Sequence, residues 1–213
     1  MTLGISVVAF ANDRVEILSE QTQVKTISRD EFLKLYADEH NISFSEADKR
    51  DKEETIYMLQ EENKKHGRKN TSTVTPRETK YLSINKDFYV ADHGHFTSIL
   101  RVGIHVKVNR YHLEGYGDYQ KFSEITSKGV KPSGSGTATL EDIAFTTRIG
   151  EDSGYENEII MLYDGIVEHA ISASLTGDAT KAGFTIRGNV GTTYYCRKPV
   201  KINYTFNSNV NLN

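Results

Sequence analysis

The chain has 213 residues, of which 37% are hydrophobic, enough for one principal domain but too few for two of full size. Its 26 Lys and Arg residues nearly balance 29 Asp and Glu residues, and the net charge of -3 gives no field that would recruit nucleic acid or an anionic membrane. Cys196 is the one cysteine, which excludes an intramolecular disulfide and a cysteine-based zinc cage and indicates a buried, inert thiol.

The first eleven residues resemble the end of a bacterial-type export signal. Residues 2–11 are almost wholly apolar and end in Ala9-Phe10-Ala11, the small-x-small pattern that precedes a signal-peptidase site, and polar residues follow from Asn12. We therefore predict that residues 1–11 are the remnant of a signal peptide and that the protein is secreted or displayed at the cell surface. No Lys or Arg run precedes this segment, as expected if translation starts upstream of Met1. The alternative is an apolar strand of a cytosolic protein.

No stretch of the sequence reaches the roughly 18 apolar residues that a membrane-spanning helix needs, so no transmembrane segment is predicted.

An extended arm and two helices are predicted over residues 12–66. Short β-type runs at residues 15–18 and 24–27 form the arm. Ser28 and Glu31 make a capping box, and apolar residues follow at helical spacing, which predicts a helix over residues 29–40.

A second capping box, Ser43 with Glu46, opens a helix that runs to about His66, before Gly67 ends it. Its interior is mostly charged. Ion pairs at i,i+4 are expected to support it: Glu46 with Arg50, Asp48 with Lys52, and Glu61 with Lys65.

A polar segment over residues 67–80 is predicted to be a linker, followed by an antiparallel β domain over residues 81–213. Residues 101–109 and 200–207 alternate between apolar and polar, the pattern of half-buried strands. Further strands are expected at residues 81–91, 96–100, 137–149, 183–187 and 192–196, with Gly-rich turns at 129–136 and 176–183. The predicted fold class is mainly β, an antiparallel sandwich or barrel preceded by a small helical hairpin.

The dipeptide Asp164-Gly165 joins two apolar β-type runs, residues 159–163 and 166–175. Because Asp-Gly favours a type I′ turn, this segment is predicted to be a long hairpin.

The histidines are the first candidates for chemistry. Asp92, His93 and His95 lie around one glycine, and His105 and His112 follow. On adjacent strands such groups could converge on zinc, copper or iron, since imidazole and carboxylate suit these metals. The alternative is a solvated hairpin tip, where polar residues collect for backbone reasons.

No hydrolase motif, phosphate-binding loop or cofactor motif is present in the sequence, so no catalytic residue and no cofactor is predicted. Acidic pairs at residues 141–142 and 151–152 favour solvated loops over a glycosidase site. Tyr111, Tyr116 and Tyr119 could stack on a sugar or dock a peptide, or they could cap sheet edges with their hydroxyls in water.

Three functions remain open. The first is a non-enzymatic β-sandwich protein that binds a protein or glycan, with the helices as a spacer, docking element or lid. The second is a secreted metal-dependent hydrolase with its site at Asp92, His93 and His95. The third is a self-assembling or membrane-inserting β protein that rearranges through the Ser/Thr-rich residues 170–187.

Overall fold

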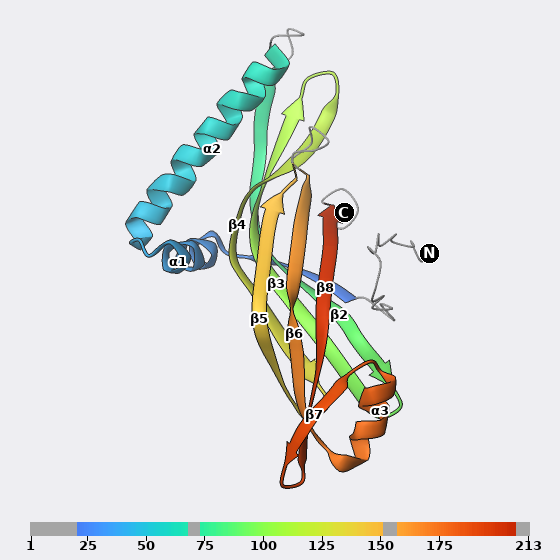
Figure 1. The fold of residues 1–213 in the computed structure, drawn as a ribbon. Coiled ribbons are helices and arrows are strands. Elements are labelled where there is room, and N and C mark those ends of the chain that lie inside the picture. Colours follow the sequence, from blue (N-terminus) through green and yellow to red (C-terminus); the bar gives the residue numbers. More distant parts are fainter. Residues whose placement is uncertain (1–20, 68–72, 151–156, 208–213) are drawn as a thin grey trace.

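The computed structural model describes residues 21–67, 73–150 and 157–207 (Figure 1). The predicted export segment and the first run of the arm, residues 15–18, lie outside the described residues. Within the described residues, no helix combines the length and the apolar character that crossing a membrane requires.

The described residues form two four-stranded sheets, and all neighbouring strands in them are antiparallel. Sheet A has the order β1 (Gln21–Ile27), β2 (Val74–His93), β3 (Phe96–Leu113) and β4 (Gly117–Gly134). Sheet B has the order β5 (Thr137–Ile149), β6 (Glu158–Ser172), β8 (Thr193–Asn207) and β7 (Thr185–Val190). The predicted fold class, mainly β with a helical hairpin, is confirmed.

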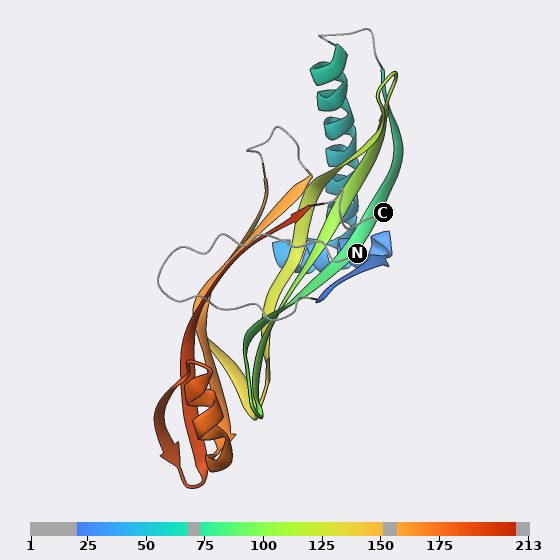
Figure 2. The ribbon, with the colours of Figure 1, turned by 90° about the vertical axis from the view of Figure 1, so that its right-hand side faces the viewer.

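The apolar core joins the two sheets. Alternation along β2 and β3 buries residues such as Ile84 and Ile104 from sheet A, and β6 adds Val167 from sheet B. The rings of Phe88 on β2 and Tyr204 on β8 meet edge to face at 5.5 Å. Figure 2 shows sheet B to the left of sheet A and the two helices that precede β2 behind sheet A, so the two sheet faces have different neighbours.

The helical pair forms as predicted, with α1 at Arg29–His40 and α2 at Phe44–Gly67. The hydroxyls of Ser28 and Ser43 each accept a hydrogen bond at 3.1 Å, from the backbone N–H of Glu31 and of Glu46. The pairs Glu46–Arg50 and Asp48–Lys52 form, at 3.0 and 2.6 Å. The third acid, Glu61, pairs with Lys64 at 2.5 Å.

The predicted linker is in part a strand. Val74–Lys80 is the first section of β2 and pairs with residues 108–113 of β3, while residues 68–72 lie outside the described part of the chain. Val74 is buried in a small apolar cluster with Tyr111 and Leu113, and the polar residues that follow it are mostly exposed. Their polarity therefore reflects an exposed extended strand.

The predicted hairpin at Asp164-Gly165 is wrong. Both residues lie inside the continuous strand β6, opposite Lys201 and Val200 of β8. Burial alternates through the dipeptide, with Gly165 buried and Asp164 exposed and paired to Lys201 at 2.8 Å. Alternating burial and pairing with β8 override the local turn preference of Asp-Gly.

The two predicted Gly-rich turns are also different in the structure. Residues 129–134 continue β4, and the chain turns only at Ser135 and Gly136. The other predicted turn, residues 176–183, begins with α3 (Thr176–Lys181), and a short 3-10 helix, η1 (Ala173–Leu175), precedes it. The Ser/Thr-rich residues 170–187 therefore do not form one strand of a sheet.

Candidate binding groove

The predicted histidine site is a hairpin tip. Asp92 and His93 end β2, His95 lies in the turn to β3, and all three side chains are exposed. The backbone N–H of His95 donates to Asp178 Oδ2 of α3 at 2.9 Å, which holds the turn against that helix. Within residues 21–67, 73–150 and 157–207, no three His, Cys, Asp or Glu side chains come close enough to share a metal ion.

The other two histidines of that prediction lie on β3, away from the tip. His105 is partly buried, and His112 Nδ1 lies 2.6 Å from Asp118 Oδ1 of β4. The structure therefore does not bring the four histidines together.

The three tyrosines near the β3–β4 turn do not form one surface. Tyr111 is buried, Tyr116 is exposed at the turn, and the hydroxyl of Tyr119 donates to Glu62 Oε2 of α2 at 2.7 Å. Of the three, Tyr116 is exposed, Tyr119 is partly buried and Tyr111 is buried.

A serine and a histidine lie in hydrogen-bond contact inside the core. His169 Nε2 is 2.9 Å from Ser98 Oγ, and Nδ1 is 2.8 Å from the carbonyl oxygen of Ser135. Both side chains are fully buried, and the rings of Phe96 and Phe184 pack edge-on against the imidazole. Burial lowers the pKa of His169, which favours the neutral ring with its proton on Nδ1. The pair links the two sheets and has no access for a substrate.

Cys196 is buried, as predicted, opposite His169 in the β6–β8 pairing. Burial raises the pKa of its thiol to about 11, so the thiolate that reacts or binds metal is scarce at neutral pH.

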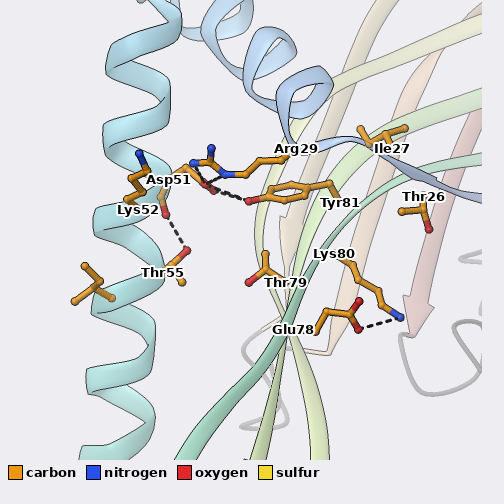
Figure 3. A pocket seen from close by; sticks show the side chains of 11 residues that line it. Thr26, Ile27, Arg29, Asp51, Lys52, Thr55, Glu78, Thr79, Lys80 and Tyr81 are labelled. Carbon is orange, nitrogen blue, oxygen red and sulfur yellow. Dashed lines mark hydrogen bonds and ion pairs between the residues drawn. The ribbon is translucent and has the colours of Figure 1, made fainter.

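An open groove lies between α2 and the edge of sheet A, with a volume of about 810 Å³ (Figure 3). Four elements contribute to it: β1, the first residue of α1, α2 and β2. Its lining residues are Thr26, Ile27, Arg29, Asp51, Lys52, Thr55, Ile56, Glu78, Thr79, Lys80 and Tyr81.

Asp51 organises one wall of the groove. Arg29 donates through Nε and Nη2 to Asp51 Oδ2 at 2.9 and 2.7 Å, and the Tyr81 hydroxyl donates to the same oxygen at 3.1 Å (Figure 3). Burial acts to raise the pKa of Asp51, but the hydrogen bonds and charges of Lys107 and Arg29 outweigh it and hold that pKa below its usual value. The same burial, with the Asp51 charge, raises the pKa of Tyr81. This wall is therefore an ionised, preorganised cluster.

The floor of the groove is an unpaired strand edge. β1 pairs with β2 only from Tyr81 to Asp87, so in the described part of the chain no strand covers the outer side of residues 78–80. Pro76 and the bulge at Arg77 interrupt the edge before that point. A short run of backbone donors and acceptors thus remains open beside α2.

The sequence did not indicate this groove, because it arises from where β1 stops along β2 and from how α2 lies over the sheet. Its members are ordinary surface residue types, and the capping boxes of α1 and α2 were the one local signal nearby.

The fold and the groove define a two-sheet antiparallel β protein in which a helical hairpin covers the outer face of one sheet. No protein-family model matches the chain, and no curated protein or solved structure is significantly similar to it.

Proposed function

We propose that this is a secreted or cell-surface protein without enzymatic activity that binds an extended segment of a partner protein in the groove between α2 and β2. The observation that carries the proposal is the combination of an open strand edge at residues 78–80 with a helix on the facing side. Extended peptides bind to such edges through main-chain hydrogen bonds, and neighbouring side chains select the sequence. The apolar residues 2–11, followed by polar ones, support the export part of the proposal.

A polypeptide fits the groove better than a glycan does. Sugar binding relies on exposed aromatic faces, and Tyr81, the aromatic residue in the lining, is buried with its hydroxyl bonded to Asp51. The exposed lining instead offers charges of both signs, with Lys80 and Glu78 on β2, and an apolar side chain, Ile56, on α2. These groups suit a short peptide of mixed polarity.

The test starts from a peptide library displayed on phage and selected against the purified protein. Selected peptides are then measured by isothermal titration calorimetry against Ile56→Glu, in the groove, and Ile143→Glu, on β5. The two isoleucines are matched controls because their exposed fractions are 58% and 52%.

We expect Ile56→Glu to weaken binding by about tenfold or more, since a charge replaces an apolar contact, and Ile143→Glu to leave binding unchanged. The proposal is wrong if no peptide is enriched, or if both variants bind the selected peptides as the parent protein does.

A further inference from the structure

The surface that α2 turns toward sheet A is acidic. Asp51 and Glu62 are buried and Glu54 is partly buried, and their spacing places them along one side of the helix. By contrast, Ile56 and Tyr57 are exposed. This pattern is the reverse of an ordinary amphipathic helix, whose apolar stripe faces the core.

Lys107 of β3 is the first point of attachment. Its ammonium group is fully buried and lies 2.7 Å from Asp51 Oδ1, 2.5 Å from Glu54 Oε2 and 2.8 Å from Thr55 Oγ1. It also donates to the backbone carbonyl of Asp51 at 3.1 Å. All of these bonds from Lys107 go to one turn of α2.

Glu62 makes the second attachment, about 16 Å further along the helix at 1.5 Å per residue. Lys121 Nζ of β4 lies 2.7 Å from Glu62 Oε1, and the Tyr119 hydroxyl donates to Oε2 at 2.7 Å. Near this end Asn63 Oδ1 accepts a hydrogen bond from the N–H of Val74 at 3.1 Å.

The face of sheet A beneath α2 is polar and incompletely bonded. His105 and Asn109 alternate with the core residues of β3 and so share the face of Lys107. The atoms His105 Nδ1 and Asn109 Nδ2 are buried, and among the described residues neither has a hydrogen-bond partner. Water would satisfy these atoms and rehydrate the ions if the helix left. The apolar cost of undocking comes from Leu59, which packs beside Val74, while Ala47 lies in the α1 cluster next to the turn.

α1 is attached differently. Phe32 and Leu33 are fully buried with Tyr81 in an apolar cluster, and the short turn from Asn41 to Ser43 leads from α1 into α2. α1 is thus fixed by apolar packing, and the turn gives α2 a point about which to move.

We propose that α2 is a releasable arm, held to sheet A by the carboxylates that enclose Lys107 and Lys121, and that it swings away as a unit while α1 and both sheets keep their structure. Release removes the α2 wall of the groove and uncovers Lys107 and Lys121 on a polar sheet face. The arm thereby controls when the surface is presented.

Glu124 gives the release a dependence on pH. It lies opposite Lys107 in the β3–β4 pairing, and the groups that face it are Tyr36 of α1, Asp51 and Glu54 of α2, and Lys107 of β3. Burial and then the Glu54 charge raise the pKa of Glu124 to about 7, from an ordinary value of 4.5. A raised pKa means that the docked state holds a proton that the released state gives up. The contribution of Glu124 to docking is therefore fully present below its ordinary pKa of 4.5, and it is lost progressively as the pH rises from there through 7.

Asp51 has the opposite sign. Its pKa is lowered in the docked state, so its contribution is present above its ordinary value of 3.8 and is lost only in stronger acid. Docking is accordingly tightest at about pH 4, between the ordinary pKa values of Asp51 and Glu124.

Hydrogen exchange of the intact chain, followed by mass spectrometry, tests the proposal without a ligand. Protection factors for the amides of α2 are compared with those of β3 and β6, at about pH 6 and about pH 8.5. We expect the protection of α2 to fall by about tenfold or more at the higher pH, because an isolated helix of this kind is marginal in water, while β3 and β6 keep theirs.

Two variants and one control variant test the proposal further. Glu124→Gln should abolish the alkaline loss of protection. Lys107→Met should lower α2 protection already at about pH 6, whereas Lys49→Met, which removes an exposed lysine from the same helix, should not. The proposal is overturned if α2 and β3 lose protection together, if α2 protection is the same at both pH values, or if Glu124→Gln keeps the parent's response.

Discussion

The turn between β4 and β5 requires glycine at position 136. Gly136 has a φ of +69°, and a Cβ there would overlap the carbonyl oxygen of Ala170. Gly115 has a φ of +83° but open space around it. A side chain there would meet the strain of the left-handed backbone but no steric overlap.

We predict that Gly115→Ala lowers the free energy of unfolding by about 1–2 kcal/mol, the usual cost of a left-handed conformation for an L-residue. Gly136→Ala should cost more, at least about 3 kcal/mol, because backbone strain and steric overlap add. Urea denaturation of both variants measures the difference. Equal losses would mean that the β5–β6 backbone moves aside freely.

Helix α1 is the anchor of the helical pair. Phe32 is fully buried, and its ring lies 4.9 Å from that of Tyr81 on β2. Phe32→Ala should lower the free energy of unfolding by about 3–5 kcal/mol through the cavity that it leaves. Phe44→Ala, at the exposed start of α2, should change it by less than about 0.5 kcal/mol. Thermal denaturation followed by circular dichroism compares the two, and similar shifts for both variants would contradict this role for α1.

Elements determined by contacts between residues close in sequence were predicted more accurately than elements determined by distant contacts. The N-terminal ends of α1 and α2 were predictable because the hydroxyls of Ser28 and Ser43 accept hydrogen bonds from backbone N–H groups three residues away. Asp164-Gly165 misled because its turn preference is local, whereas its environment is set by pairing with β8. Burial alternates along residues 159–171 in the structure, but the sequence does not show it, because residues 159–163 are all apolar.

The candidate groove and the buried lysines were not predictable in the same way. Lys107 falls at a polar position of an alternating strand, which indicates solvent unless another element covers that face. The covering helix is itself charged on its buried side, so hydrophobic pattern gives no sign of the contact. Both features depend on how elements far apart in sequence are placed.

At the scale of the whole molecule, the two sheets should fold without the helices. Sheet A buries its apolar face against sheet B, and the face that α2 covers is polar. The test is a shortened protein in which a flexible linker of about twelve residues replaces residues 29–73. Such a linker is long enough to span the roughly 23 Å from the end of β1 to Val74.

We expect this shortened protein to show the circular dichroism of β structure and one cooperative thermal transition, at a lower temperature than the full chain. It should also lose binding to any peptide selected with the intact groove. Aggregation or a featureless thermal scan would show that the helices are part of the folding unit.

The two sheets are also separated along the chain: every strand of sheet A ends by Gly134, and every strand of sheet B begins at or after Thr137. A ribosome makes the chain from its N-terminus, so a nascent sheet A has all its strands before the first residue of sheet B exists. Until the second half emerges, its inner face, with Ile84, Phe88 and Ile104, has nothing to pack against. Synthesis thus passes through an incompletely folded, aggregation-prone intermediate. During that interval the nascent chain depends most on chaperones.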